Sequence, residues 1–458
     1  MKLKPSLLNV LVSTDPRGPV VYNTGSAGAL LVPEALARWL TGRRHDWRQG
    51  LAFARLMPEL ARLGFVVDDT ADELARPRHE FLARRFGRHH LAVTLFMTHS
   101  CNLTCSYCYQ AGYMRRAPTM TVEVAARIAR LIEGQARVLQ PKSINVTLFG
   151  GEALVAAAAC ARVVVDLRDM ERRLGIPVEI HTCSNGSLIT SLADSPVTKL
   201  QDGFGITLDG PRRTHDAVRK ERSGAGSYDR IMSGIKLLCS RGLHLGVRIH
   251  TNDLDGPGLL EVLDDLAATG IGATQEPTIF LASHTAGGCD SLSACNRSCI
   301  DQWVDEDTAR IAALVPFLQG HPLEPWVQVY GHQHGGHPLQ PSAGSCISCT
   351  QSGLSIDSDG AVFHCPSFTT EADIAGRIVE QGRVTWNAER LRMLLWRWWR
   401  DGPCASCEYL ALCGASCPRE TIPSLEACPL RRLHHNRIER YLKDNPAAEA
   451  RRGAVPVH

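Results

Sequence analysis

From residue 91 onward, short apolar runs alternate with longer segments in which apolar residues recur every three or four positions. The short runs predict β-strands at residues 91–96, 144–148, 178–182, 204–208, 245–249 and 278–281. The amphipathic segments predict helices at residues 124–131, 154–174, 227–241 and 257–268. This alternation predicts a parallel sheet whose functional residues follow the carboxyl ends of the strands. Six units are fewer than a complete eight-unit barrel contains, so the expected fold is α/β, with a partial (β/α)6 TIM-like barrel over residues 91–283.

Residues 1–90 carry a weaker pattern and no cysteine. The expected elements are a strand at 19–23, a helix beginning near Pro33, a helix over 53–63 that stops at Gly64, and a strand at 65–67. This order fits a small winged-helix-like α+β domain. A basic helical connector at 80–88 is expected to lead from it into the barrel.

The remaining third of the chain is loop-rich and punctuated by cysteine. We divide it into a linker or insertion with Cys and His at 284–345, a cysteine-rich domain at 346–440 and a frayed tail at 441–458. The expected architecture is therefore a barrel with a small domain before it and a loop-rich iron–sulfur or zinc domain after it.

Composition narrows the class of protein. Apolar residues make up 44% of the chain and charged residues 21%, which is ordinary for a globular protein. The net charge of +3 is too small for a nucleic-acid surface, and no apolar run is long enough to span a membrane. The N-terminus lacks the features of a signal peptide, so a cytoplasmic location is expected. In such a chain, 17 cysteines indicate metal ligands rather than disulfides.

Three of these cysteines, Cys101, Cys105 and Cys108, form a C-x3-C-x2-C triplet directly after the first predicted barrel strand. Three thiolates on a tight loop can bind three irons of a 4Fe–4S cluster and leave the fourth iron open. The alternative is a zinc knuckle, but structural zinc sites take four ligands, typically in C-x2-C pairs. The aromatic Tyr107 just before the last cysteine makes the pattern more specific for the cluster.

The stretch Cys-Asn-Leu-Thr-Cys-Ser-Tyr-Cys from Cys101 to Cys108 resembles the motif of the radical S-adenosylmethionine (SAM) superfamily. The resemblance implies a partial α/β barrel whose open iron binds the amino and carboxylate groups of SAM. It also implies that one electron from the cluster cleaves SAM to methionine and a 5′-deoxyadenosyl radical, which then removes a hydrogen atom from the substrate. An external electron donor of the flavodoxin or ferredoxin type is implied as well. No acid or base is assigned from the sequence.

Further positions match the family in order and spacing. Gly150-Gly151-Glu152-Ala153 stands where the family usually has Gly-Gly-Glu-Pro, and Glu152 is implied to pair with the SAM ammonium. Thr207 is implied to contact the SAM ribose or carboxylate, and Arg219 to hold the carboxylate. The implied cofactor-binding set is Tyr107, Gly150, Gly151, Glu152, Ser184, Thr207 and Arg219.

Some of these positions have a plainer interpretation. Ser184 and Asn185 follow the third strand, where a ribose contact could originate, but Asn185-Gly186 is also a common turn dipeptide. Asp209 and His215 are explained equally well by turn and cap chemistry.

A dense second run of cysteines, Cys404-x2-Cys407-x5-Cys413-x3-Cys417-x10-Cys428, resembles the SPASM extension of radical SAM enzymes. That extension carries two auxiliary 4Fe–4S clusters, which gives three clusters in all. The implied ligands of the first auxiliary cluster are Cys346, Cys349, Cys365 and Cys417, and those of the second are Cys404, Cys407, Cys413 and Cys428. Two interleaved zinc sites are the alternative.

Six cysteines remain outside these sets. Cys160, Cys183 and Cys239 lie in helix or strand patterns and are expected to be small buried hydrophobic residues. Cys289, Cys295 and Cys299 lie in a predicted loop with no place in the family pattern, where plain thiols are favoured over a metal site. The group His332, His334 and His337 is expected to be a mobile loop, and Trp396, Trp398 and Trp399 are expected to pack the extension against the barrel.

The resemblance implies an enzyme that modifies a side chain of a ribosomally made peptide. A sulfatase-type maturase, which oxidises one Cys or Ser of a protein, is a rival. In that rival the family places an acidic base directly after the cysteine matching Cys365, whereas this chain has Pro366 and Ser367. A rival of another class is a non-catalytic iron–sulfur electron carrier. Residues 1–90 are expected either to bind a leader peptide by adding a strand or merely to cap the first barrel strand.

Overall fold

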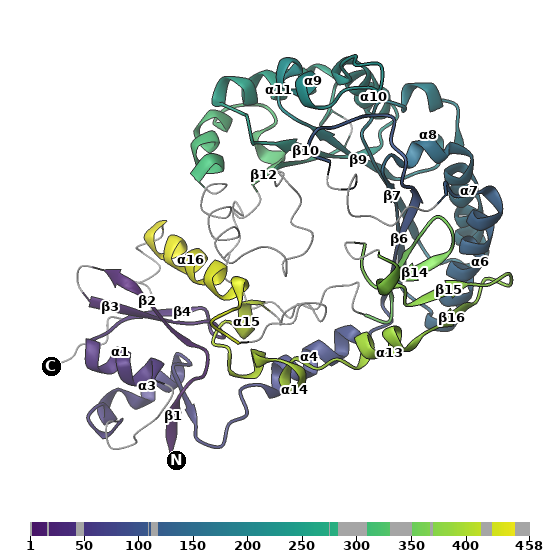
Figure 1. Cartoon of the computed structure of the whole chain (residues 1–458). Coiled ribbons are helices and arrows are strands. Elements are labelled where there is room, and N and C mark those ends of the chain that lie inside the picture. The colour runs from purple at the N-terminus through teal and green to yellow at the C-terminus, as the bar shows by residue number, and fades with distance from the viewer. Residues whose placement is uncertain are drawn as a thin grey trace.

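A single long sheet forms the centre of the molecule, and it curves so that helices cover its outer side (Figure 1). The computed structural model describes residues 2–15, 18–42, 50–108, 110, 118–273, 275–282, 309–329, 350–366, 370–413 and 424–444. No helix within these ranges is long and apolar enough to cross a membrane.

The six predicted barrel strands are present and lie side by side in chain order. They are β6 (His90–Thr98), β7 (Ser143–Gly150), β8 (Val178–Ser184), β9 (Gly203–Leu208), β10 (His244–His250) and β11 (Thr278–Ala282). All pair in parallel, and the short β12 (Val327–Val329) adds a further parallel strand beside β11. The α/β partial barrel expected from the sequence is confirmed.

The helices between the strands cover the outer face of the sheet (Figure 1). They are α6 (Val122–Leu139), α7 (Ala157–Leu174), α8 (Pro196–Lys199), α9 (Arg212–Val218), α10 (Tyr228–Ser240) and α11 (Gly256–Ala268), with 3-10 turns at Ala153–Ala156 and Thr190–Leu192. Alternate strand residues, such as Val247 and Ile249 of β10, are fully buried against these helices. Because side chains alternate across a strand, the residues between them face the inside of the curve.

Strands from the C-terminal third continue the barrel sheet. β13 (Gly353–Ile356) pairs in parallel with β6, and the antiparallel strands β14 (Ala361–Phe363), β15 (Gly376–Ile378) and β16 (Val384–Trp386) follow it outward. Helices α13 (Ala388–Leu395), α14 (Trp398–Asp401), α15 (Leu410–Cys413) and α16 (Pro429–Asp444) complete this part. Short 3-10 turns lie at Val315–Leu318, Glu324–Trp326, Glu371–Asp373 and Pro403–Ser406.

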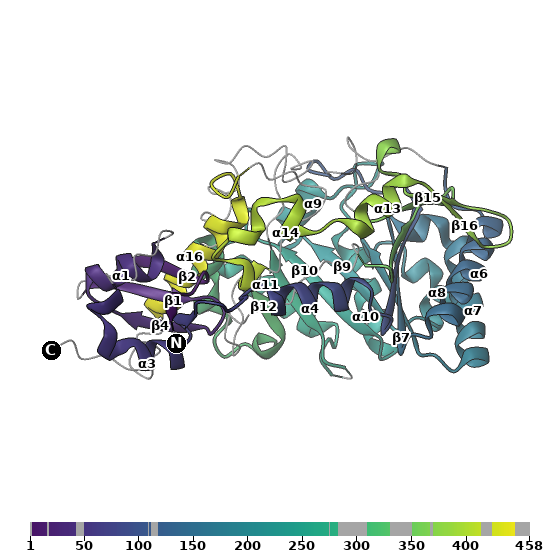
Figure 2. The same ribbon diagram turned by 90° about the horizontal axis from the view of Figure 1, so that it is seen from below.

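The N-terminal residues form a small α+β unit to one side of the barrel (Figure 2). Its strands are β1 (Leu3–Pro5), β2 (Asn9–Asp15), β3 (Gly18–Asn23), β4 (Gly28–Leu31) and β5 (Val66–Asp68). β2, β3 and β4 form an antiparallel sheet, β1 pairs with β5, and the helical elements are α1 (Glu34–Thr41), η1 (Ala54–Leu56) and α3 (Met57–Arg62). Gly64 ends the second helical stretch with φ 82°, as predicted.

The connector helix α4 (Ala75–Arg85) overturns one sequence-based expectation. The Phe81 ring of α4 contacts Trp396, Trp398 and Trp399, with ring centroids 5.7–6.4 Å apart. Trp398 shares a hydrophobic core with the N-terminal sheet and with the cysteine-rich segment. The expectation that these tryptophans pack the extension against the barrel is therefore wrong, because an apolar face of α4 and of the N-terminal sheet covers them instead.

Candidate functional site

The cysteine triplet lies at the carboxyl edge of the sheet, on the loop that follows β6. The end of α9 and the segment after it hold this loop in place, since Ser106 N donates to Val218 O at 3.3 Å and Thr104 N donates to Lys220 O at 2.7 Å. This is the edge of the sheet at which the strand pattern predicted functional residues.

The three thiols of the triplet lie close enough to interact electrostatically. Burial raises the pKa of Cys105 to about 11, while the nearby Arg219 guanidinium lowers it. Burial also raises the pKa of Cys101, and both Cys105 and Cys101 feel the charge of Cys108. Iron binds the thiolate form of cysteine, so cluster binding here would displace the protons of the three thiols. The three sulfur atoms are soft ligands and partly buried. This donor set fits a 4Fe–4S cluster with one open iron.

Within the described residues, no group of three or more His, Cys, Asp or Glu side chains converges on the position of a single metal ion. A cluster places a separate iron at each thiolate, so its ligands need not converge on one point. The assignment of the triplet to a cluster therefore rests on spacing and donor chemistry.

Gly150 and Gly151 allow the end of β7 to press against the chain just before Cys101. A Cβ on Gly150 would lie 2.2 Å from Thr98 O, and one on Gly151 would lie 2.6 Å from Ser100 O. Gly150 also has φ 142°, which a residue with a side chain rarely adopts. The two glycines thus set the position of the cysteine loop against its neighbouring strand.

Glu152 joins the ends of β7 and β8 below the triplet. Its side chain is almost completely buried and accepts hydrogen bonds from Asn185 N at 2.6 Å, Ser184 Oγ at 2.8 Å and Leu154 N at 3.0 Å. Burial raises its pKa, and these donors oppose that rise. The structure thus brings Glu152 and Ser184 together, and it gives Glu152 a role in fastening two strand ends.

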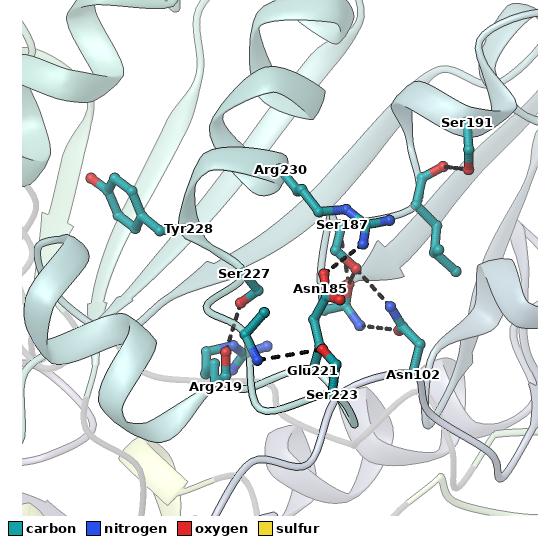
Figure 3. Close-up of polar contacts among 12 residues, drawn as sticks. Asn102, Asn185, Ser187, Ser191, Arg219, Glu221, Ser223, Ser227, Tyr228 and Arg230 are labelled. Atoms are coloured by element: carbon teal, nitrogen blue, oxygen red, sulfur yellow. Dashed lines mark hydrogen bonds and ion pairs between the residues drawn. The ribbon is translucent and has the colours of Figure 1, made fainter.

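Asn185 connects the end of β8 to the triplet loop (Figure 3). Its Nδ2 donates to Asn102 Oδ1 at 2.9 Å and lies 3.8 Å from Cys101 Sγ, while Asn102 Nδ2 donates to Ser187 Oγ at 2.8 Å. Gly186 has φ 84°, and Ser187 N donates to Asn185 Oδ1. Asn185 therefore forms the turn that the sequence indicated and also contacts the cysteine loop.

Tyr107 is the centre of a buried polar group beside the triplet. Its hydroxyl donates to Asp209 Oδ2 at 2.5 Å and accepts from Arg219 Nη1 at 2.5 Å, across 102 and 112 residues of sequence. His250 Nδ1, at the end of β10, lies 2.5 Å from Asp209 Oδ1. Burial alone would raise the pKa of Asp209, but His250 and Arg219 lower it to about 2. Two adjacent strand ends are thus linked to the loop by an ionised carboxylate.

A second set of contacts closes this group into a ring. Asp209 N donates to His215 Nδ1 at 3.2 Å, and His215 Nε2 lies 3.0 Å from Ser227 Oγ. Ser227 Oγ in turn donates to Arg219 O at 2.8 Å (Figure 3). Burial lowers the pKa of His215 to about 4, and Arg219 contributes to the lowering. His215 is therefore neutral near pH 7 and holds the Asp209 turn to α9, which supports the plainer interpretation of His215.

Thr207 differs from the other implied cofactor residues. It is half-buried on the inner face of β9, and its side chain makes no hydrogen bond within the described part of the chain. Thr207 is the last residue but one of β9, so its side chain lies near the carboxyl edge of the sheet, on the inner face.

The sequence did not single out His99, Asp357 or His250. His99 Nε2 lies 2.7 Å from Asp357 Oδ1, and Asp357 follows β13 directly. Asp357 is fully buried, and the pair links the loop before Cys101 to the C-terminal extension. Each residue stands at or just after a strand end, which is the signal that could have identified it.

The second implied auxiliary set is described completely. Cys404 and Cys407 are buried, and Cys413 and Cys428 are half-buried. Cys407 N donates to Cys404 O at 3.1 Å, and burial raises the pKa of Cys407 to about 12, with Glu408, Cys413 and Cys404 also raising it. At least three of these thiols therefore lie near one another.

Other cysteines and histidines of interest lie outside the described residues. They are Cys346, Cys349, Cys417, Cys289, Cys295, Cys299, His332, His334 and His337. Of the first auxiliary set only Cys365, half-buried after β14, is described. Cys160 and Cys239 are buried, as expected, but Cys183 is exposed on the inner face of β8. The prediction for Cys183 is wrong because its neighbours Thr182 and Ser184 take the buried positions of the strand.

Known proteins resemble this chain in sequence. A family model described as the radical SAM superfamily matches residues 95–267. The serine-type anaerobic sulfatase-maturating enzyme of Bacteroides thetaiotaomicron is 23% identical over 350 residues, which is 70% of this chain and 80% of that enzyme. The pre-heme d1 synthase of Dinoroseobacter shibae is 27% identical over 60% of this chain and 59% of its own length.

The fold is also similar to that of solved structures. Polyhistidine-tagged anSMEcpe with bound AdoMet has a TM-score of 0.52 at 14% identity, over 80% of this chain and 96% of that one. Streptococcus suis SuiB bound to S-adenosylmethionine has a TM-score of 0.45 at 13% identity, over 91% and 95%. The family model thus shows a radical SAM domain at residues 95–267, and the likeness to anSMEcpe shows a shared fold. SAM and a 4Fe–4S cluster are the cofactors of such a domain.

Proposed function

We propose that this protein is a radical SAM peptide maturase that carries three 4Fe–4S clusters. The observation that carries the proposal is the cysteine triplet at the carboxyl edge of the barrel. Glu152, Asn185 and Asp209 from neighbouring strand ends, and Arg219 from the end of α9, fasten its loop. A simple electron carrier would need no such set of polar groups around an open iron.

In this proposal, Cys101, Cys105 and Cys108 hold the cluster to which SAM binds. When bound, SAM and the cluster would supply the radical chemistry needed to remove hydrogen from an unactivated carbon. Arg219 lies beside Cys105 and supports the SAM carboxylate, while Asp209 and Tyr107 hold the guanidinium in position. Glu152 keeps the ends of β7 and β8 together and provides the negative charge for the SAM ammonium.

The C-terminal cysteines are proposed to hold two auxiliary clusters. Cys404, Cys407, Cys413 and Cys428 would bind one, and Cys346, Cys349, Cys365 and Cys417 the other. Each set has four thiolates and no open iron, which suits electron transfer. An external donor of the flavodoxin or ferredoxin type would supply electrons.

The N-terminal unit is proposed to recognise a leader peptide. A cavity of about 990 Å³ lies between this unit and the second cysteine set, and its lining includes Lys4, Leu11, Tyr409 and Cys428. Its borders include residues of β1 and β2, so an extended peptide has strand backbone within reach.

A sulfatase-type maturase is the second candidate. The likeness to the enzyme of Bacteroides thetaiotaomicron favours it, because that protein is named as sulfatase-maturating. Pro366 after Cys365 counts against it, since proline cannot act as the acidic base expected there.

An anaerobic incubation with SAM, dithionite and a short peptide encoded beside the gene tests the proposal. A change in peptide mass together with 5′-deoxyadenosine supports a maturase. Modification of a sulfatase-derived Cys or Ser peptide alone supports the second candidate, and the absence of 5′-deoxyadenosine with either peptide contradicts both.

A further inference from the structure

One strongly basic side chain on the inner face of the barrel has no role in the site described above. Arg248 lies on β10 between the buried residues Val247 and Ile249, so it faces the inside of the curved sheet. Its side chain is exposed and forms no ion pair or hydrogen bond within the described part of the chain. An unpaired guanidinium inside a barrel is a ready partner for an anion.

Among the described residues, two glycines lie on the sheet surface beside Arg248. Gly246 of β10 pairs with Gly205 of β9, which pairs in turn with Cys183 of β8. A Cβ on Gly205 would meet only Cys183 Sγ, at 3.7 Å, and one on Gly246 would meet nothing closer than 3.9 Å. The two glycines therefore leave a shallow floor between Cys183 and Arg248, with room for a main chain or a small side chain.

The order of residues along β10 shows how far this floor lies from the cysteine triplet. Arg248 pairs with Thr207, two residues nearer the carboxyl edge than the glycine row. His250, a further two residues on, belongs to the Tyr107–Asp209 group beside Cys105. Two residues of a strand span about 6.6 Å. A ligand bound at Arg248 would therefore lie roughly that far from the Tyr107–Asp209 group, toward the amino ends of the strands.

The acidic residues on the strands beside Arg248 have other partners, so its guanidinium is free to bind an anion. Asp209, which follows the adjacent strand β9, is held by Tyr107, His250 and Arg219. Glu179 faces the same side of β8 but lies four residues further from the carboxyl edge than Cys183, and it accepts from Asn145 Nδ2 at 2.7 Å. Cys183 is near enough for Arg248 to lower its pKa, against the larger rise that desolvation inside the barrel causes.

We propose that Arg248 binds a carboxylate of the substrate peptide, either an Asp or Glu side chain or the C-terminal carboxylate, above the floor formed by Gly205 and Gly246. The inference rests on the proposed peptide maturase function and adds the chemistry of its substrate site. A bidentate guanidinium–carboxylate pair fixes both position and orientation. Arg248 is thus a specificity-determining residue that places the peptide below the radical source.

The test compares Arg248→Met and Arg248→Lys with the exposed Arg213→Met, a control on the outer helix α9. The probe is the precursor peptide encoded beside the gene, labelled for fluorescence anisotropy, in versions with each Asp, Glu or C-terminal carboxylate replaced by its amide. Wild type should lose about tenfold or more in affinity for one amide version, because hydrogen bonds between charged groups are the strong ones.

Arg248→Met should bind the unmodified peptide about tenfold more weakly and show no further loss with that amide version. Arg248→Lys should lose less, and Arg213→Met should match wild type. SAM affinity, measured by equilibrium dialysis, should not change. Equal peptide affinity in Arg248→Met overturns the inference, and weaker SAM binding would show that the carboxylate is that of SAM. If wild type modifies no peptide, the proposed function fails instead.

Discussion

At the scale of single residues, Tyr107 is the side chain through which the cysteine loop is fastened to the barrel. Its hydroxyl contacts Asp209 and Arg219, which are both buried and charged. Both partners reach Tyr107 from more than 100 residues away, so sequence spacing predicted the residue but not its contacts.

Replacing Tyr107 with Phe should loosen the triplet loop without unfolding the barrel. Two buried charged groups would lose a hydrogen-bond partner, at a cost of about 1–3 kcal/mol. Iron release from the triplet to a chelator should therefore quicken on the order of tenfold. Tyr228→Phe removes a comparable bond, to Asp265 on the outer side, and should leave the release rate unchanged. Equal rates in the two variants would contradict the role of Tyr107.

Glu152→Gln should weaken SAM binding and also lower stability. The amide of Gln offers one acceptor where three donors converge, so at least one buried donor loses its partner at about 1–3 kcal/mol. Equilibrium dialysis with SAM and urea unfolding measure the two effects, and iron content should be unchanged. Glu171→Gln, whose carboxylate accepts from Val178 N away from the site, is the control for the SAM effect. Normal SAM affinity in Glu152→Gln would remove the cofactor role.

At the scale of elements, the sequence predicted the strongly periodic strands and helices well. It did not predict which elements from distant parts of the chain pack against each other. Each of the six barrel strands has buried alternate residues, which is the pattern that sequence reveals. The contact of β13 with β6 could not be predicted, because pairing between strands more than 250 residues apart leaves no local signal. The tryptophans were assigned to the wrong partner for the same reason: an aromatic cluster shows burial but not what buries it.

Trp398→Ala should destabilise the C-terminal extension rather than the barrel. Trp398 is almost fully buried against Phe81, and loss of a buried Trp costs about 3–5 kcal/mol. The reconstituted variant should lose iron from the Cys404 set and keep the iron of the triplet. Trp386→Ala, at a Trp that is 42% exposed, is the control and should keep both. Loss of iron from the triplet alone would contradict the packing described for α4.

At the scale of the whole molecule, the N-terminal unit and the second cysteine set share one hydrophobic core. Val10, Val20 and Tyr22 lie in the same buried cluster as Cys404 and Cys407, and Thr24 Oγ1 donates to Glu408 O at 2.6 Å. This junction was not foreseen, since residues 1–90 carry neither a cysteine nor a motif that points to the extension. The proposed leader-binding unit and the proposed electron-transfer site are therefore physically continuous.

Removal of residues 1–70 should accordingly have two effects. Leader binding, measured by fluorescence anisotropy, should disappear, and iron should also be lost from the Cys404 set, because its apolar cover is gone. The triplet should keep its iron, and the protein should still cleave SAM, but without modifying the peptide. A truncated protein that retains all its iron would contradict the shared core, and one that binds the leader with unchanged affinity would place recognition elsewhere.

We propose above that a radical generated at the Cys101, Cys105 and Cys108 site removes a hydrogen atom from a peptide carbon. The most direct measurement is the transfer of deuterium from a fully deuterated precursor peptide into 5′-deoxyadenosine, followed by mass spectrometry under reducing, anaerobic conditions. We expect one deuterium in 5′-deoxyadenosine with the wild-type protein and no 5′-deoxyadenosine when all three cysteines are replaced by Ala. Unlabelled 5′-deoxyadenosine formed alongside a modified peptide would contradict it.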